Sequence, residues 1–430
     1  MSTSSLAGAR IAIVGSGQIG LTAAYFLQQR GADITILERD SLGSGAARGN
    51  GGLMSSTSAT VLNEPGIVSH GLRHLFSSSS AFFVDPRALP SMSRWLMQFA
   101  RRTSQRDFDI AVKKLDLLTV DTFALFDKLG AEGIGTQSGA GMLRCFASES
   151  AARADREATL RLGVGRPVAQ TPGGIMDRTD LVALEPSIGD DVNAGYAVAG
   201  ERFLNPSTYV DELFAVLSDR GLDFRRGEEV VEVVEDAGRG VVRTRGGVES
   251  FDRVLVAAGA RSTSLLEGFG ARMLIRPGKG YSFSFELDDE LSRVLFFGDA
   301  HAAAIPLGGG RVRMAGTMEF DGSYDRLNQR RISALKSVAE RNVRGIRWDT
   351  VGEEWVGARP MTVDGLPFIG PVSPAGSVHV ATGHNMIGFA LGPSTGQLVA
   401  DLMSGVRRPA EEAAFDPFRF SRRAGKRTLP

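Results

Sequence analysis

Cysteine and histidine are scarce in this sequence, and their scarcity excludes several classes of protein. The 430 residues include a single cysteine, Cys145, and five histidines. One cysteine cannot form a disulfide framework within the chain, so we expect a reducing compartment. A thiolate metal site would need more cysteines, and the histidines lack the spacing of metal ligands. The sequence therefore predicts neither a disulfide-rich secreted protein nor a metal centre.

The chain also lacks an excess of charge and a long apolar run. Its 49 Lys and Arg residues balance its 49 Asp and Glu residues, so the formal net charge is zero. Without a basic excess to neutralise phosphates, we expect no nucleic-acid partner. No apolar run approaches the roughly 18 to 20 residues needed to span a bilayer. Residues 1–9 are too few and too polar for a signal peptide, because the first expected strand begins near Arg10. We therefore expect a cytoplasmic protein.

The most informative feature that is present is a glycine-rich turn near the amino terminus. Residues 11–14 favour a strand, residues 21–30 favour a helix, and residues 35–37 are a second apolar run that ends at Glu38. Between the first strand and the helix lies the pattern G-x-G-x-x-G, made of Gly15, Ser16, Gly17, Gln18, Ile19 and Gly20. This order of elements is typical of a dinucleotide-binding βαβ unit.

Each part of this motif has a physical task in binding a dinucleotide. Gly15 permits the tight turn, Gly17 lets a pyrophosphate approach the backbone, and Gly20 lets the helix pack closely on the strand. The positive end of the helix faces the phosphates, and the Glu38 carboxylate accepts hydrogen bonds from ribose hydroxyls. Because that carboxylate would repel a 2′-phosphate, the motif predicts FAD or NAD rather than NADP.

Beyond the motif, helical and strand-like regions follow one another. Residues 64–160 have mainly helical periodicity, whereas short β-rich runs begin at residue 223. We expect helices over 109–129, 148–162, 206–220, 328–341 and 392–403, with Asn205 as a cap and Gly130 and Gly405 as stops. We expect strands over 229–235, 240–245, 252–259, 281–286, 311–316 and 377–383.

The segments that suit a nucleotide site lie at the start, middle and end of the chain, so two domains must be interleaved. The predicted fold is α/β: a Rossmann-like FAD-binding domain (1–75, 200–272 and 355–425) interleaved with an α+β substrate domain built on an antiparallel sheet (76–199 and 273–354). Interleaving is common in flavoproteins, whereas NAD dehydrogenases usually keep their dinucleotide fold contiguous. The arrangement therefore favours FAD.

One helical segment allows two interpretations. In residues 91–102, the apolar side chains of Met92, Trp95, Leu96 and Phe99 form a stripe beside three arginines. Such a helix suits an anionic membrane surface, which would make the protein peripheral at the inner membrane face. The commoner alternative is that the stripe packs on the chain's own core.

Five segments, in family order and over nearly the whole chain, resemble the D-amino-acid oxidase superfamily of FAD-dependent oxidoreductases. The resemblance is greatest to its bacterial D-amino-acid dehydrogenase branch. The segments are the glycine-rich turn with Glu38-Arg39, then residues 48–53 (RGNGGL), 279–282 (KGYS), 357–367 (GARPMTVDGLP) and 382–396.

The resemblance implies oxidation of an amino acid. A hydride passes from Cα to flavin N5, and the resulting imino acid hydrolyses to a 2-oxo acid and ammonia. The flavin is the electron sink, so the protein needs neither a nucleophile triad nor a metal. The FAD should be non-covalent, because no cysteine lies in the carboxy-terminal flavin segments. The electrons would pass to a quinone of the respiratory chain or to dioxygen.

Two alternatives to this function stay open. The nearest is an enzyme of the same superfamily that oxidises a small secondary amine or imino acid, such as glycine, sarcosine, proline or hydroxyproline. An alternative of another class is a nucleotide-binding scaffold without activity, which the presence of the motif glycines, Glu38 and Arg359 disfavours.

The resemblance also implies which residues meet the substrate. Arg359 matches the family's arginine that clamps the substrate carboxylate, and a guanidinium can donate two parallel hydrogen bonds to it. The alternative for Arg359 is an ion pair with an internal acid such as Asp364 or Glu353. Tyr281 would add a hydroxyl donor or wall the cavity, or else be an ordinary tyrosine of a half-buried sheet.

Further residues are implied at the cofactor. His384 and Asn385 begin a loop beside the flavin, where His384 either contacts the ring or only packs. We expect Asn50, Gly52 and Leu53 along the isoalloxazine ring, with Gly51 and Gly52 keeping the backbone close to it. Val230 is expected at the adenine end, and Ala258 and Gly259 under the ribose and pyrophosphate. The backbone of Met386, Ile387 and Gly388, with the helix that follows, would face flavin N1 and O2. Arg39, Arg48, Gly357 and Gly383 complete the expected set.

The sequence departs from the family pattern at Ala46-Ala47, where many relatives have a Ser or Thr. A backbone contact or an Arg48 contact would have to replace that hydroxyl at the phosphates.

Overall fold

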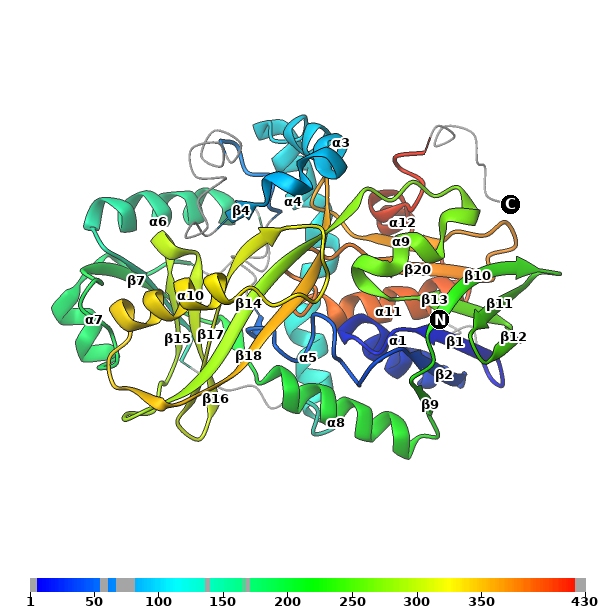
Figure 1. Cartoon of the computed structure of the whole chain (residues 1–430), viewed down its shortest axis with the longest axis horizontal. Coiled ribbons are helices and arrows are strands. Elements are labelled where there is room, and N and C mark those ends of the chain that lie inside the picture. Colours follow the sequence, from blue (N-terminus) through cyan, green and yellow to red (C-terminus); the bar gives the residue numbers. More distant parts are fainter. Residues whose placement is uncertain are drawn as a thin grey trace.

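Two large sheets, each with helices packed on it, make up the computed structural model, which describes residues 6–54, 61–66, 82–135, 140–164, 166 and 171–421. In Figure 1 the first sheet lies on the right and the second on the left. The long strands β14 (Ile275–Leu287) and β18 (Ile346–Thr362) run diagonally through the middle of the molecule.

The first sheet has six strands in the order β19-β20-β13-β1-β2-β9. They are β1 (Arg10–Val14), β2 (Asp33–Glu38), β9 (Asp223–Arg226), β13 (Arg253–Val256), β19 (Phe368–Pro371) and β20 (Val378–Thr382). All neighbouring strands are parallel except the edge pair β19–β20. Parallel strands are covered on both faces, which explains apolar runs such as residues 11–14. The sheet confirms the expected Rossmann-like α/β fold, with strands from the start, middle and end of the chain.

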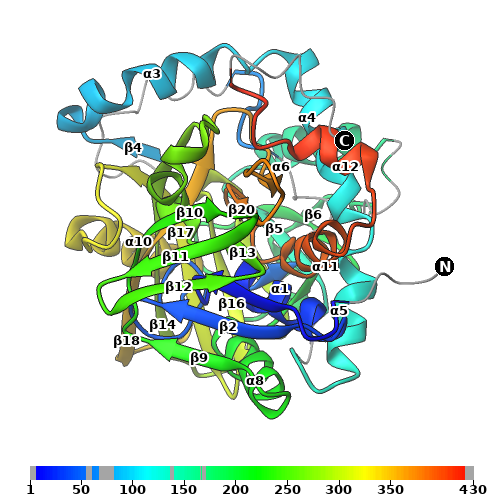
Figure 2. The ribbon, with the colours of Figure 1, turned by 90° about the vertical axis from the view of Figure 1, so that its right-hand side faces the viewer.

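Helices α1 (Gln18–Gln28) and α11 (Gly392–Met403) pack against each other beside this sheet (Figure 2). Their approach is close, since a Cβ added to Gly396 would lie 2.6 Å from the Thr22 carbonyl oxygen. Helix α8 (Pro206–Asp219) also packs on α1. Asn205 caps α8 as predicted, because its side chain accepts a hydrogen bond from the backbone N–H of Ser207.

A three-stranded antiparallel meander lies between β9 and β13 in the chain. Its strands are β10 (Val230–Asp236), β11 (Arg239–Thr244) and β12 (Gly247–Phe251). The first two coincide with expected strands to within one residue.

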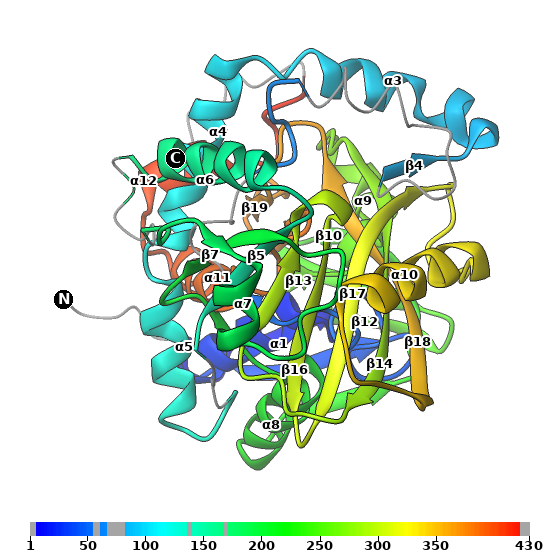
Figure 3. The same cartoon turned by 90° about the vertical axis from the view of Figure 1, so that its left-hand side faces the viewer.

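The second sheet is mainly antiparallel and follows the order β18-β14-β17-β16-β15-β5-β7-β6, with β4 paired to β17. Besides β14 and β18, its strands are β4 (Phe82–Val84), β5 (Met142–Phe146), β6 (Met176–Asp177), β7 (Ala194–Val198), β15 (Val294–Phe297), β16 (Ala302–Gly308) and β17 (Arg311–Phe320). The expected strands 281–286 and 311–316 are parts of β14 and β17. Helix α10 (Gln329–Asn342), expected over 328–341, packs on β14 and β17 (Figure 3). Helices α6 (Glu149–Gly163) and α7 (Arg178–Leu184) pack near β5 and β7.

The expectation of one helix over 109–129 is wrong. The structure has α4 (Gln105–Thr119) and α5 (Thr122–Gly130), with a break at Val120 and Asp121. Asp121 stands in the cap position of α5, where an aspartate is better tolerated than in a helix interior. The continuous apolar periodicity across the break concealed it.

Helix α3 (Leu89–Ala100) contains most of the segment 91–102, whose apolar stripe suits either a membrane surface or the chain's own core. Met92, Trp95 and Phe99 are buried in a cluster with Phe320 and other residues of the second sheet. The Trp95 indole N–H donates to the carbonyl of Met361 at 3.2 Å. The stripe therefore packs on the chain's own core. Among the described residues, no helix combines the length and the apolar character required to cross a membrane.

The remaining elements are short. Strand β3 (Leu53–Met54) pairs with β8 (Arg202–Phe203), and α9 (Ser262–Leu265) and α12 (Pro409–Phe415) are helices of one or two turns. Turns of 3-10 helix span Pro86–Ala88, Gly259–Arg261, Glu267–Phe269 and Gly298–Ala300. The residue boundaries expected for the two domains stay a prediction.

Candidate active site

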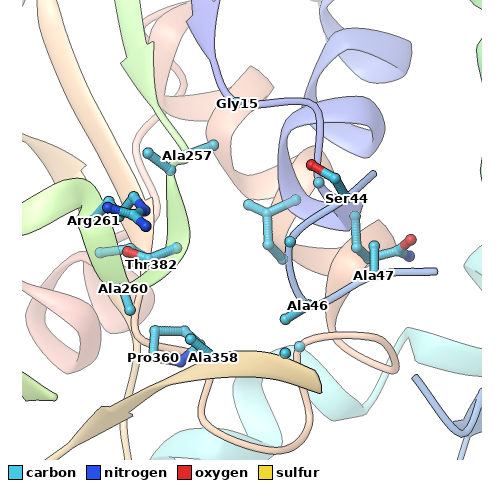
Figure 4. A pocket seen from close by; sticks show the side chains of 18 of the residues that line it. Gly15, Ser44, Ala46, Ala47, Ala257, Ala260, Arg261, Ala358, Pro360 and Thr382 are labelled. Carbon is cyan, nitrogen blue, oxygen red and sulfur yellow. Dashed lines mark hydrogen bonds between the residues drawn. The ribbon is translucent and has the colours of Figure 1, made fainter. Parts of the chain in front are cut away.

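A cavity of about 430 Å³ opens at the carboxyl ends of the parallel strands β1, β2, β13 and β20 and reaches β18 of the second sheet. In Figure 4, Gly15 lies on one side of the cavity and Ala358 of β18 on the opposite side, with Ser44 to Ala47 along a third. The carboxyl edge of a parallel sheet is where open α/β folds bind their ligands.

The glycine-rich turn is shaped both by its own packing and by the cavity. Gly15 has φ +104°, and a Cβ there would lie 2.9 Å from the Ala257 carbonyl oxygen. A Cβ on Gly20 would lie 2.1 Å from the Gly15 carbonyl oxygen, so this glycine serves the packing of α1 on the turn. Gly17 differs, because a Cβ there would meet no atom of the described residues within 4 Å and would enter open space beside the cavity.

The Glu38 carboxylate is fixed at the cavity wall. One of its oxygens accepts hydrogen bonds from the backbone N–H of Ser16 at 2.8 Å and from the Ser16 hydroxyl at 2.7 Å. The other accepts from the Asp40 backbone N–H at 2.9 Å. Ser16 does not itself line the cavity, so it orients Glu38 from behind.

The segment 48–53 is held in place largely from outside the cavity. Arg313, which is buried, donates to the carbonyl oxygens of Arg48 at 2.7 Å and Asn50 at 3.1 Å. The Arg48 side chain turns away to form an ion pair with Asp211. Asn50 lines the cavity, whereas Arg48, Gly51, Gly52 and Leu53 do not. The structure therefore does not support a contact between the Arg48 side chain and a phosphate in place of the missing hydroxyl.

Arg359 lines the cavity, and its guanidinium has no acidic partner among the described residues. Its Nη1 donates to the Thr317 carbonyl at 2.8 Å, and the guanidinium lies over Gly280, where a Cβ would be 2.1 Å from the Arg359 Cζ. No carboxylate of the described residues lies within 4 Å of its nitrogens; the nearby acids considered as alternatives are engaged elsewhere. Asp364 pairs with Arg419 at 2.7 Å, and Glu353 pairs with Arg311 at 2.6 Å. Burial lowers the pKa of Arg359 to about 10, which leaves it a cation at neutral pH.

The structure contradicts the placement of Tyr281 at the cavity. Its side chain is buried on the opposite face of β14, in a cluster that includes Phe283, Ile332 and Leu335, and its hydroxyl donates to the Glu319 carboxylate. Successive residues of a strand point to opposite faces, so Gly280, not Tyr281, lies beside Arg359. Tyr281 is thus the sheet tyrosine of the alternative interpretation.

His384 and Asn385 line the cavity but are bound to the protein through their side chains. The His384 Nε2 lies 3.0 Å from the Thr395 hydroxyl, and burial lowers the pKa of His384 to about 3, so the ring is uncharged at neutral pH. Asn385 has φ +52°, and its amide bonds the backbone of Thr362, Gly365 and Gly383. These contacts fix the loop, in which the backbone N–H groups of Asn385 and Ile387 donate to the carbonyls of Pro360 and His384.

The structure brings most of the expected residues together. Those that line the cavity are Gly15, Gly17, Gln18, Ile19, Glu38, Arg39, Asn50, Val230, Ala258, Gly259, Gly357, Arg359, His384, Asn385, Met386 and Gly388. Those that do not are Ser16, Gly20, Arg48, Gly51, Gly52, Leu53, Tyr281, Gly383 and Ile387. Residues such as Gly20 and Gly52 shape the backbone next to the cavity: a Cβ on Gly52 would lie 2.0 Å from the Leu204 carbonyl oxygen.

Sequence reasoning missed a polar group at the cavity mouth. The Arg261 guanidinium lies 4.1 Å from the centre of the Tyr324 ring and 3.4 Å from the Asp325 carboxylate. Arg261 follows the expected Ala258-Gly259 turn, but Tyr324 and Asp325 belong to the loop between β17 and α10, which carries no motif. Only the tertiary structure brings them together.

The cavity fits FAD. The amino terminus of α1 begins at Gly17 without a capping side chain, so its first backbone N–H groups and the open space beside Gly17 suit a pyrophosphate. The Oε1 of Gln18 is buried without a partner among the described residues, which marks this end of the helix as incomplete in the protein alone. Glu38 would hold the ribose and Val230 would contact the adenine. Gly357 to Arg359 and His384 to Gly388 would surround the other end of the cofactor.

Comparisons with known proteins agree with this geometry. The model of the DAO family, described as FAD dependent oxidoreductase, matches residues 10–402. A D-amino acid dehydrogenase of Methylobacterium sp. (strain 4-46) is 27% identical over 423 residues, which cover 95% of this chain and 98% of that protein.

Solved structures share the fold. Glycine oxidase from Geobacillus kaustophilus matches with a TM-score of 0.71 and 22% identity, covering 96% of this chain and 99% of that one. Iminodiacetate oxidase from Chelativorans sp. BNC1 matches with a TM-score of 0.69 and 20% identity, covering 95% and 99% of the two chains. L-proline dehydrogenase from P. horikoshii matches with a TM-score of 0.67 and 17% identity, covering 96% and 98%. The chain therefore belongs to the DAO family of FAD-dependent oxidoreductases, is an enzyme of that family, and has FAD as its cofactor.

Proposed function

We propose that the chain is an FAD-dependent dehydrogenase of D-amino acids, which it deaminates to 2-oxo acids and ammonia. The observation that carries the proposal is the partly buried guanidinium of Arg359 at the cavity, which has no carboxylate within 4 Å among the described residues. A partly desolvated cation without a counter-ion is costly, and the carboxylate of an amino acid would supply that counter-ion when substrate binds. The 27% identity to a D-amino acid dehydrogenase supports the choice of stereoisomer.

Arg359 is suited to orienting the substrate as well as attracting it. The Thr317 carbonyl engages Nη1, the Met318 sulfur lies 3.7 Å from the same nitrogen, and Gly280 offers no side chain that would displace the guanidinium. A fork of parallel N–H donors would hold the substrate carboxylate in one orientation, each charge-assisted hydrogen bond contributing about 1.5 to 3 kcal/mol. With the carboxylate held, the hydrogen on Cα has a defined direction.

Bound FAD would supply the acceptor for the hydride that leaves Cα of the substrate, and water would then hydrolyse the released imino acid to the 2-oxo acid and ammonia. The chain contributes the electrostatic setting. His384 is uncharged, so Arg359 is the cation that selects a carboxylate at this part of the cavity. The backbone of Met386 and Gly388 and the start of α11 would supply dipoles that favour negative charge on a bound, reduced cofactor.

The alternative is oxidation of a small secondary amine or imino acid, whose carboxylate the same guanidinium would hold. The electron acceptor is a quinone of the respiratory chain or dioxygen. The test is an anaerobic screen in which bleaching of the flavin absorbance is followed with D-amino acids, L-amino acids, glycine, sarcosine, proline and hydroxyproline. We expect D-amino acids to reduce the flavin fastest. Faster reduction by L-amino acids or by sarcosine would refute the proposed substrate, and rapid reoxidation with peroxide formation in air would identify dioxygen as the acceptor.

Replacing Arg359 tests the residue on which the proposal depends. Arg359→Ala should keep FAD bound but weaken substrate binding by about 100-fold or more, because two charge-assisted hydrogen bonds are lost. The measurement is the substrate concentration that gives half-maximal anaerobic reduction. Unchanged affinity would remove the clamp assignment.

A further inference from the structure

The Thr317 carbonyl, which accepts a hydrogen bond from Arg359, belongs to a β-bulge. Along β14 the chain advances two residues from Lys279 to Tyr281, whereas along β17 the partners Glu319 and Gly316 are three residues apart. Thr317 stands in the bulge with φ +61°, a conformation that a β-branched residue rarely adopts. Such a conformation persists only when the surrounding structure imposes it. The contacts that impose it should therefore influence where the Thr317 carbonyl points.

Those contacts lie on the opposite face of the sheet. Lys279, fully buried, donates to Asp321 at 2.8 Å and to the Arg326 carbonyl at 2.7 Å, and it forms an ion pair with Glu319 at 3.0 Å. Glu319 also accepts from the Tyr281 hydroxyl and, at 2.8 Å, from the Asn328 amide. Although burial opposes it, hydrogen bonds from Lys279 and Arg326 lower the pKa of Asp321 to about 2, so this carboxylate is charged. We name Lys279, Tyr281, Glu319 and Asp321 the buried network.

The buried network is attached to both sides of the bulge. Lys279 and Tyr281 are the β14 residues that flank Gly280, over which the Arg359 guanidinium lies. Glu319 follows the bulge in β17, two residues after Thr317, and α10 covers this face of the sheet (Figure 3). The network also pairs its own acids with Lys279, so neither Glu319 nor Asp321 is left to neutralise Arg359. One arrangement thus serves two requirements: a fixed carbonyl and a free guanidinium.

We propose that the buried network positions Arg359: through Glu319 it holds the bulge that presents the Thr317 carbonyl, and this carbonyl orients the guanidinium toward the substrate carboxylate. The proposal rests on the proposed function, in which Arg359 binds that carboxylate. Tyr281, Glu319 and Lys279 are positioning residues, since they reach the cavity only through the strands that they join.

The test uses the FAD-loaded protein and benzoate as a carboxylate probe, whose binding is followed by the change in flavin absorbance. Tyr281→Phe removes one hydroxyl and keeps the shape of the core. It should raise the dissociation constant of benzoate about 3- to 10-fold, the change that corresponds to one hydrogen bond, while FAD content stays unchanged. When Tyr281→Phe is combined with Arg359→Lys, it should raise the dissociation constant of benzoate less than about twofold, because an ammonium is a point charge without a plane to orient.

Tyr196→Phe is the matched control. Tyr196 is a fully buried tyrosine of β7 in the same sheet, and its hydroxyl donates to the Asp155 carboxylate at 2.5 Å. The control should lower the thermal unfolding midpoint about as much as Tyr281→Phe does, yet leave benzoate binding unchanged. Equal weakening by both tyrosine changes, or equal weakening by Tyr281→Phe in both Arg359 backgrounds, would show a merely structural role and overturn the proposal. Unchanged binding in Tyr281→Phe would overturn it too.

The failure of the proposed function gives a different result. If Arg359→Ala binds benzoate as tightly as the parent protein, Arg359 is not a carboxylate clamp, and both proposals fall. If Arg359→Ala loses benzoate but Tyr281→Phe does not, the clamp stands and only the positioning role is refuted.

Discussion

A substitution at Gly17 should affect cofactor binding strongly and folding stability only slightly, so it separates the two effects. Within the part of the chain that the structure describes, no atom lies within 4 Å of the Gly17 Cβ position, and its φ of −74° suits any residue. In Gly17→Val the fold itself should therefore lose only the difference between glycine and valine at a helix N-cap, about 1 kcal/mol. The side chain would instead occupy the space beside the first N–H groups of α1, where the pyrophosphate is expected.

The expected loss of FAD affinity is much larger than the loss of stability. If two charge-assisted hydrogen bonds from the helix terminus are lost, at about 1.5 to 3 kcal/mol each, the dissociation constant should rise by about 100- to 10,000-fold. The assay is titration of apoprotein with FAD, with thermal unfolding of the apoprotein measured alongside. A variant that purifies with the same yellow colour as the parent and the same FAD affinity would refute the location of the pyrophosphate.

Gly20→Ala is the matched contrast. Its Cβ would lie 2.1 Å from the Gly15 carbonyl oxygen, so α1 or the turn must move. Overpacking of this kind costs about 1 to 3 kcal/mol and should lower the stability of the apoprotein itself. Without FAD, Gly20→Ala should thus unfold at a lower temperature than Gly17→Val. The reverse order would contradict the roles assigned to the two glycines.

Two further predictions concern the substrate end and acid stability. Gly280→Ala would place a methyl group 2.1 Å from the Arg359 Cζ, so benzoate affinity should fall about 10-fold or more while FAD stays bound; unchanged benzoate affinity would contradict the geometry over β14. Burial lowers the pKa of His379 to about 3 from an ordinary 6.5, so the unfolded chain binds a proton between these values that the folded chain does not. Stability should therefore fall as the pH drops below 6.5, by up to about 1.4 kcal/mol per pH unit for this residue. His379→Gln should reduce the difference in unfolding free energy between pH 7 and pH 5 by about 2 kcal/mol in urea titrations; an unaltered difference would show that His379 is not buried uncharged.

The fold was predictable wherever local signals and tertiary packing agree. The turn from Gly15 to Gly20 is such a place: its glycine pattern is local in the sequence, and Gly20 is required by its contact with the Gly15 carbonyl oxygen. The break at Val120 and Asp121 was not predictable, since the apolar stripe continues through it. Strand β18 was missed as well: it is a 17-residue strand with many exposed positions, and its pairing with β14 is a long-range property.

The site was predictable at the level of motifs and less so at the level of side-chain direction. Arg359 and Tyr281 both belong to segments that resemble the family, yet they lie on opposite faces of the same sheet. A shift of one residue in a strand reverses its face, and the sequence of β14 alternates small and apolar residues without marking which face meets the cofactor. The pair of Arg261 and Tyr324 depends on the meeting of two loops, which no local pattern encodes.

The central claim is that Arg359 selects a substrate by its carboxylate. The most direct measurement compares a D-amino acid with its amide, in which a neutral group of similar shape replaces the carboxylate, by anaerobic reduction of the bound flavin. In the parent protein we expect the acid to reduce the flavin at concentrations about 100-fold lower than the amide, and in Arg359→Ala we expect this preference to disappear. Equal reduction by the acid and the amide in the parent protein would contradict the account.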